Sequence, residues 1–122
     1  MKILFVCSAN MDRSPTAEYI YANHPGLEVK SAGTYNHAQQ RIDAELLQWA
    51  DAILCMEERH KQSIEEKYPE MISGKIIDFL DVPDLYPYRH PVLIKMIKEK
   101  VDAWLLTVQP DLESDSKEYQ HL

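Results

Sequence analysis

The stretch ILFVCSANMDRSPTAE, residues 3–18, decides the fold of this chain. Residues 3–6 form a continuous apolar run, which is typical of a central strand that helices cover on both faces. Ser14 is a good helix N-cap, and Pro15 suits the first helical position because its missing N–H would have no partner there. We therefore predict a strand, a turn, and a helix that begins just after Ser14.

The turn between this strand and this helix is expected to bind an anion. Unpaired backbone N–H groups and the positive end of the helix dipole meet at a helix N-terminus. Cys7 lies where the strand ends, and Arg13 follows after five intervening residues with a planar fork that can grip two oxygens of a tetrahedral oxyanion. A thiol in this positive field is expected to ionise readily, and Ser14 can donate its hydroxyl to the thiolate. The pattern indicates a nucleophilic cysteine.

Residues 7–15 (CSANMDRSP), followed by Ala17-Glu18, resemble the phosphate-binding loop of the low-molecular-weight protein tyrosine phosphatases. The resemblance continues in SAGT (residues 31–34), in ILCME (53–57), and loosely in an acidic loop before the last helix. Within this span the chain is shorter than typical members, chiefly after Thr34, and it is similar to a compact bacterial branch of predicted phosphatases. A shortened segment there implies a shallower substrate pocket.

Strands and helices are expected to alternate along the chain, which predicts an α/β fold with a parallel sheet and helices on both faces. The resemblance implies a three-layer α/β/α arrangement of the phosphatase I type, with four parallel strands in the order 2-1-3-4. Later strands are expected at residues 27–32, 52–56 and 76–79, and helices at 15–23, 43–50, 57–68 and 91–106. The 57–68 helix is interpreted as a charged surface helix with His60 on its solvated side.

Residues 1–108 are expected to form one phosphatase-like domain, followed by a polar C-terminal tail, residues 109–122, that we expect to be disordered. The 122-residue chain has a formal net charge of −7, which argues against nucleic acid as a partner. We identify no leader and no long apolar segment, so we expect a cytoplasmic protein without a membrane partner. Cys7 and Cys55 are expected to be thiols in that compartment, with Cys55 buried in a strand.

The expected reaction is the hydrolysis of a phosphate monoester, carried by a phosphorylated protein or a small aryl phosphate. Cys7 would attack phosphorus in line, and water would hydrolyse the phosphocysteine, with no metal or other cofactor. The residues expected to hold the phosphoryl group are Ser8, Ala9, Asn10, Met11, Asp12 and Arg13.

A general acid is expected in the proline-containing loop over residues 80–90, because a phenolate leaves slowly at neutral pH unless it is protonated. The resemblance places an Asp-Pro-Tyr-Tyr segment here. Asp84-Leu85-Tyr86 keeps the aspartate and the following aromatic in register, so Asp84 is favoured. Asp81 fits the count back from the last helix and remains the alternative.

The resemblance also implies a hydrogen-bond network that holds the loop in shape, formed by Asn10, Ser14, Ser31 and His37. Asn10 tolerates the left-handed backbone conformation that a tight anion loop requires. Asp12 stands where several relatives have a second loop cysteine, and its carboxylate would oppose ionisation of Cys7 if it pointed inward.

The sequence is compatible with three other functions. The loop also resembles the phosphocysteine loop of the sugar-transport IIB proteins, which pass a phosphoryl group on without hydrolysing it. An arsenate reductase-like enzyme would use the same loop with further cysteines. A non-catalytic phosphate or phosphopeptide binder would keep the loop and lack turnover.

Overall fold

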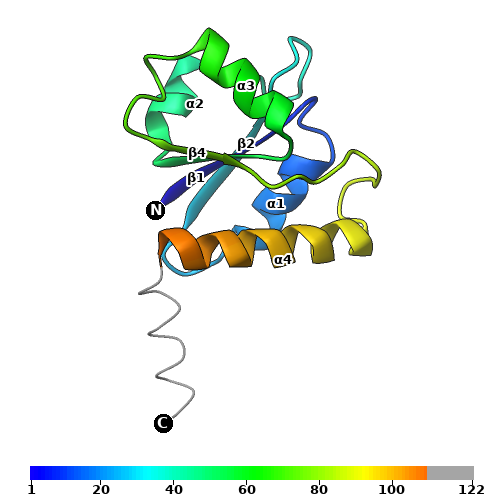
Figure 1. Cartoon of the computed structure of the whole chain (residues 1–122). Coiled ribbons are helices and arrows are strands. Elements are labelled where there is room, and N and C mark those ends of the chain that lie inside the picture. Colours follow the sequence, from blue (N-terminus) through cyan, green and yellow to red (C-terminus); the bar gives the residue numbers. More distant parts are fainter. Residues whose placement is uncertain (110–122) are drawn as a thin grey trace.

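A computed structural model describes residues 1–109, and these contain a parallel sheet between two layers of helices (Figure 1). The strands, in the spatial order β2-β1-β3-β4, are β1 (Lys2–Cys7), β2 (Glu28–Gly33), β3 (Ala52–Cys55) and β4 (Ile76–Phe79). The helices are α1 (Arg13–Tyr21), α2 (Ala44–Trp49), α3 (Glu58–Lys67) and α4 (Pro91–Val108). The expected fold class and strand order are confirmed. Residues 110–122, most of the predicted tail, lie outside the described residues.

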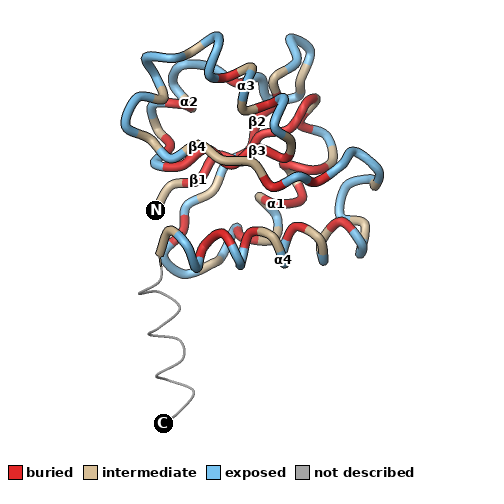
Figure 2. Tube along the Cα trace, viewed as in Figure 1, coloured by how far each residue is buried: buried red, intermediate tan, exposed pale blue. Residues whose placement is uncertain are grey.

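The two faces of the sheet are buried by different helices. Helices α1 and α4 pack on one face and α2 and α3 on the other (Figure 1), and buried segments line both sides of the sheet (Figure 2). Along β1, Ile3 and Phe5 join the core with α1 and α4, whereas Leu4 and Val6 join the core with α2 and α3. This double burial explains why the strand is a continuous apolar run and does not alternate.

The carboxyl end of β1 is the place where this sheet is expected to bind a ligand. Strand β1 pairs with β2 on one side and β3 on the other, so the chain reverses its direction of progress across the sheet at β1. In open α/β sheets, ligands bind beyond the carboxyl ends of the strands at such a point. Cys7 is the last residue of β1 and therefore lies at this expected binding position.

The start of α1 differs from the sequence prediction. The helix begins at Arg13, with Asp12 at the N-cap position, so the prediction of Ser14 as the N-cap is wrong. The Ser14 hydroxyl does not satisfy an end of the helix; it contacts Cys7, Asn10 and the carbonyl of Ala32. The residue therefore lies inside the first turn, where its side chain serves the loop.

The end of β2 lies against the loop that follows β1. A Cβ atom at Gly33 would lie 2.5 Å from the carbonyl oxygen of Ser8 and 2.9 Å from the backbone nitrogen of Asn10. Both neighbours are backbone atoms, so only glycine permits this approach. The segment after Gly33 then turns back, and Gly33 forms a bridge with Arg41.

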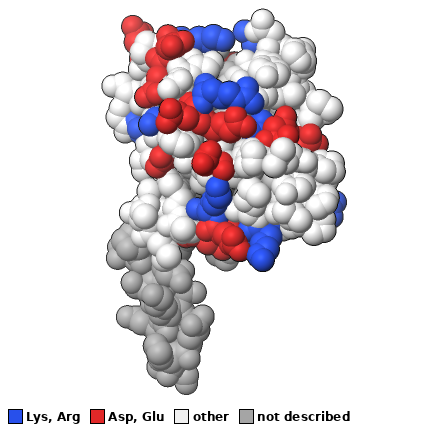
Figure 3. All heavy atoms as spheres, turned by 45° about the vertical axis from the view of Figure 1, so that its right-hand side comes forward, with Lys and Arg blue, Asp and Glu red and all other residues white. Residues whose placement is uncertain are grey.

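Acidic and basic side chains are interspersed on the face drawn in Figure 3. Within residues 1–109, no helix combines the length and the apolar character needed to cross a bilayer.

Candidate active site

The loop between β1 and α1 directs its backbone N–H groups inward. The carbonyls of Cys7, Ser8 and Ala9 accept hydrogen bonds from the backbone N–H groups of the neighbouring 34–39 segment. In a trans peptide the N–H points opposite to the C=O, so the N–H groups of residues 8–10 face the inner side of the loop. Asn10 has φ of 55°, the left-handed conformation that such a turn requires. The result is a concave set of donors next to the N-terminus of α1, which suits an anion.

Cys7 lies at the base of this loop, and its side chain contacts Ser14. The Cys7 Sγ to Ser14 Oγ distance is 3.0 Å, and the Ser14 hydroxyl also lies 3.2 Å from the carbonyl oxygen of Ala32. A Cys7 thiol can donate to Ser14, which then donates to Ala32. A thiolate needs a donor, and the Ser14 hydroxyl can turn from Ala32 to the sulfur. Ser14 is therefore placed to stabilise the ionised form of Cys7.

Asn10 connects the loop to β2. Its amide nitrogen donates to Ser14 Oγ at 3.0 Å and to Ser31 Oγ at 2.9 Å, and its amide oxygen accepts from the backbone N–H of Gln40 at 3.2 Å. The structure thus brings Asn10, Ser14 and Ser31 together but leaves His37 outside. His37 is exposed, and its ring lies 5.3 Å from that of Tyr35. Gln40 reaches Asn10 because the 34–41 segment is short and returns directly to the end of β2.

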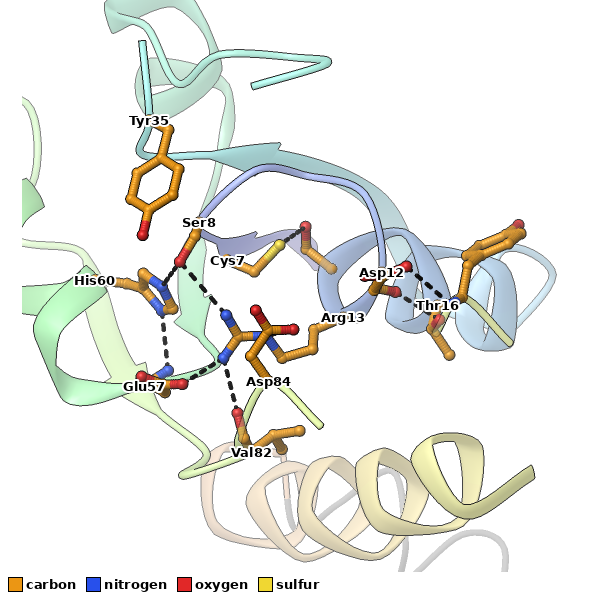
Figure 4. A network of polar contacts seen from close by, with 12 residues as sticks. Cys7, Ser8, Asp12, Arg13, Thr16, Tyr35, Glu57, His60, Val82 and Asp84 are labelled. Atoms are coloured by element: carbon orange, nitrogen blue, oxygen red, sulfur yellow. Dashed lines mark hydrogen bonds and ion pairs between the residues drawn. The ribbon is translucent and has the colours of Figure 1, made fainter. Parts of the chain in front are cut away.

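Arg13 is almost fully buried, and its guanidinium lies beside Ser8, Glu57 and Val82 (Figure 4). Nη1 donates to Glu57 Oε1 at 2.5 Å and to the carbonyl oxygen of Val82 at 3.0 Å. Nη2 donates to Ser8 Oγ at 3.4 Å. A guanidinium has five N–H donors, so these contacts leave the Nε hydrogen and one Nη2 hydrogen. That pair has the side-on arrangement of donors that can bind two oxygens of a tetrahedral oxyanion.

Glu57 lies between two arginines. Its Oε1 pairs with Arg13, and its Oε2 accepts from Arg59 Nε at 2.6 Å. Burial opposes ionisation of Glu57, but the hydrogen bonds from Arg59 and Arg13 outweigh burial and hold the pKa of this carboxyl below its ordinary value. Arg59 in turn donates to the phenol of Tyr35 at 3.4 Å, and hydrogen bonds from Arg59 and Ser8 lower the pKa of Tyr35. A charged chain thus extends from the buried Arg13 to an exposed tyrosine at the rim.

His60 is buried, so its predicted position on a solvated helix face is wrong. It is the third residue of α3, and its Nδ1 accepts the backbone N–H of Glu57 at 3.1 Å as part of a capping box. Its Nε2 lies 2.9 Å from Ser8 Oγ. Burial, followed by the charges of Arg13 and Arg59, lowers the pKa of His60 to about 4, so the ring is neutral near pH 7.

The two candidate acids are placed differently. Asp84 is 60% exposed, and its Oδ1 lies 3.8 Å from Arg13 Nε, so that its carboxylate is drawn next to the guanidinium in Figure 4. Asp81 has φ of 60°, and its carbonyl oxygen accepts from Lys100 Nζ of α4 at 2.7 Å. Of these two carboxylates, Asp84 is the one that approaches the guanidinium.

Asp12 does not point into the anion site. Its Oδ1 accepts the backbone N–H of Tyr88 at 2.9 Å, and the adjacent backbone N–H of Arg89 donates to Thr16 Oγ1 at 3.0 Å. The guanidinium of Arg89 also lies 3.9 Å from the ring centroid of Tyr19. The first turn of α1 therefore anchors the loop that carries Asp84.

Met11, also expected to hold the phosphoryl group, has an exposed side chain, so only its backbone can serve the loop.

Cys55 lies fully buried in β3, where desolvation raises the pKa of its thiol. It is thus a packing residue and does not face the loop. Residues 1–109 contain no cluster of three or more His, Cys, Asp or Glu side chains that could hold a metal ion.

Sequence reasoning missed Glu57, His60 and Tyr35 as parts of the site. A signal for His60 was present: it lies four residues before the buried Ile64, so the two share the inner face of α3, and it lies three residues after Glu57, the spacing of a capping box. No comparable signal links Glu57 to Arg13, because the pairing is tertiary.

A family model described as low molecular weight phosphotyrosine protein phosphatase matches residues 2–50, which include the whole loop. The low molecular weight protein-tyrosine-phosphatase Wzb of Salmonella typhimurium is 36% identical over 118 residues, covering 72% of this chain and 77% of that protein. The alignment has 118 positions but includes only 72% of the residues of this chain. It therefore contains gaps, at which residues of Wzb have no counterpart here.

A protein-arginine-phosphatase of Geobacillus stearothermophilus is 33% identical over 93 residues, covering 57% of this chain and 63% of that protein. The solved structure of the YwlE arginine phosphatase from the same organism matches with a TM-score of 0.63 and 30% identity, covering 90% of this chain and 96% of that chain. Together with the geometry of the loop, these matches define the class as cysteine-dependent phosphatases. Within that class, the chain belongs to the low molecular weight protein tyrosine phosphatase family.

Proposed function

We propose that this protein removes phosphoryl groups from phosphorylated proteins through a phosphocysteine on Cys7. The observation that carries this proposal is the joint placement of the Cys7 sulfur, the inward N–H groups and the free fork of Arg13 around one loop. These groups supply a nucleophile together with donors for the charge that builds up on the phosphoryl oxygens.

The first step is an in-line attack of the Cys7 thiolate on phosphorus. The S–P bond forms as the bond from phosphorus to the leaving group breaks, and the leaving atom takes a proton from Asp84. In the second step water attacks phosphorus, the S–P bond breaks, and the proton lost by water returns to Asp84. Ser14 donates to the thiolate before the first step and again when the second step releases it.

Asp84 is assigned as the acid because its exposed carboxylate lies 3.8 Å from Arg13 Nε. Among the ion pairs of the described residues, Arg13 pairs with Asp84 and not with Asp81, whose backbone carbonyl accepts from Lys100 of α4. The same carboxylate disfavours a phosphoryl carrier, because a carrier must keep its phosphocysteine intact, whereas Asp84 would activate water to hydrolyse it. An arsenate reductase is disfavoured because Cys55 is buried in β3 and cannot relay a disulfide from Cys7.

Phosphotyrosine is the substrate that the rim of the site fits best. Tyr35 and Tyr88 are both exposed beside the loop segments that carry Ser8 and Asp12, and aromatic rings on a rim can pack against a phenyl group. Phosphoarginine is a second candidate, favoured by the relatives that are named arginine phosphatases.

The test is sustained release of p-nitrophenol from p-nitrophenyl phosphate by the wild type and by Cys7→Ser. The proposal expects many turnovers from the wild type and none from Cys7→Ser. A single stoichiometric burst would indicate a carrier, and phosphate binding without release would indicate a binder; either result contradicts the proposal. Phosphotyrosine and phosphoarginine peptides of the same sequence, compared by kcat/KM, decide the substrate.

A further inference from the structure

The guanidinium of Arg13 is oriented by three acceptors that come from three parts of the chain. Glu57 precedes α3, Val82 belongs to the loop after β4, and Ser8 is the first residue of the phosphate loop. Glu57 and Val82 both accept from Nη1 and from no other nitrogen of the guanidinium. With these two contacts alone, the plane of the guanidinium could still tilt about Nη1. Ser8 holds Nη2, the nitrogen whose remaining hydrogen must face the phosphoryl group.

The Ser8 hydroxyl is itself held by His60. The backbone N–H of Glu57 donates to His60 Nδ1 at 3.1 Å, so the neutral ring carries its hydrogen on Nε2. Nε2 therefore donates to Ser8 Oγ at 2.9 Å, and the second lone pair of this oxygen accepts from Arg13 Nη2 at 3.4 Å. Ser8 and His60 are 5% and 1% exposed, so water does not compete for these hydrogen bonds. Figure 4 shows the chain from His60 through Ser8 to Arg13.

We propose that His60 and Ser8 are positioning residues that lock the fork of Arg13 in its phosphate-binding orientation. The inference rests on the proposed function for its catalytic consequence, because an oriented fork matters for turnover only if the loop binds a reacting phosphoryl group. Its binding consequence is independent, since inorganic phosphate needs the same fork.

The contact with Ser8 is not needed for the structural role of His60. The capping box uses Nδ1 only, and an acceptor on a shorter side chain would satisfy it. Nε2 reaches from α3 to the phosphate loop, 52 residues away in sequence, and makes a hydrogen bond that contributes nothing to the end of α3. The two nitrogens can therefore be separated by substitution.

The test uses two substitutions of His60 that differ in which nitrogen they replace. The amide of asparagine ends where Nδ1 lies, so His60→Asn keeps the cap and loses the donor to Ser8. The amide of glutamine ends where Nε2 lies, so His60→Gln keeps the donor. Ser8→Ala removes the acceptor for Arg13, and Gln62→Ala, at an exposed position of α3, is the matched control. The readouts are the Kd for inorganic phosphate by calorimetry and kcat/KM with p-nitrophenyl phosphate.

We expect Ser8→Ala and His60→Asn each to weaken phosphate binding and lower kcat/KM by about 3- to 10-fold, the effect of losing one hydrogen bond. His60→Gln is expected to restore most of the loss, and Gln62→Ala to resemble the wild type. The double variant Ser8→Ala, His60→Asn should lose no more than the worse single variant, because both act through one oxygen.

The proposal is overturned if both single variants keep their phosphate Kd within about twofold of the wild type, or if the two losses multiply in the double variant. It is also overturned if His60→Gln is no better than His60→Asn. A wild type that binds phosphate but shows no Cys7-dependent turnover would refute the proposed function alone. The change in phosphate Kd would then still support or overturn the positioning role.

Discussion

Replacing Gly33 by alanine is expected to displace the phosphate loop. The new Cβ would lie 2.5 Å from the carbonyl oxygen of Ser8, whereas ordinary contacts of this kind begin at 3.4 Å. The neighbour is a backbone atom, so the loop must retreat by about 1 Å, and a misplacement of that size can lower the rate by about 100-fold. Overpacking at the same place is expected to cost about 1–3 kcal/mol of unfolding free energy.

The assay is kcat/KM with p-nitrophenyl phosphate together with chemical denaturation, and Gly74→Ala is the control. Gly74 has φ of +78° with no atom within 4 Å of an added Cβ, so alanine there is strained but clashes with nothing. Its cost is about 1–2 kcal/mol of stability, with no change in rate. If Gly33→Ala is destabilised to the same extent as Gly74→Ala but keeps its full kcat/KM, the close approach of β2 does not shape the loop and the reasoning is wrong.

Three further predictions concern the carboxylates and the buried histidine. Asp84→Asn is expected to lower kcat on phenyl phosphate by about 100-fold. The loss on p-nitrophenyl phosphate should be smaller, because its leaving group needs less protonation, and Asp81→Asn should change neither rate. Equal losses in the two variants would contradict the assignment of Asp84 as the acid. Asp12→Ala removes the acceptor for the backbone N–H of Tyr88. It should lower kcat on phenyl phosphate by about 3- to 10-fold and change the Kd for phosphate little. A change in the phosphate Kd alone would indicate that Asp12 acts directly in the phosphate loop. His60, with its pKa lowered to about 4, stays neutral in the native state while the unfolded chain takes up a proton below pH 6.5. Stability should therefore fall by about 2 kcal/mol between pH 7 and pH 5 on account of this residue, and denaturation of His60→Gln should show a correspondingly smaller fall; an unchanged pH dependence would show that His60 is not the group responsible.

The fold could be predicted because local signals and topology agree. The apolar run of β1 has no polar interruption, which marks a strand buried on both faces, and the alternation of strands and helices leaves few ways to connect a parallel sheet. The start of α1 could not be predicted correctly, because Ser14 has the chemistry of a cap while its hydroxyl is used by Cys7 and Asn10. A tertiary contact thus overrides a local preference.

The site was predictable where its residues are adjacent in sequence. Cys7 and Arg13 belong to one short segment of the sequence. The strand before this segment and the helix after it place the loop at the N-terminus of a helix. The residues that orient Arg13 come from positions 57, 60 and 82 and meet it only in the folded chain. His37 was placed in the network by resemblance, but the short 34–41 segment brings the backbone of Gln40 to Asn10.

The most direct test of the account is to trap the intermediate on Cys7. The wild type and Asp84→Asn are mixed with p-nitrophenyl phosphate, quenched in acid within the first turnover, and examined by intact-mass and peptide mass spectrometry. We predict one added phosphoryl group, located on Cys7, that accumulates more in Asp84→Asn because its hydrolysis is slower in that variant. Rapid release of p-nitrophenol without any phosphoryl group on Cys7, or with the group on another residue, would contradict it.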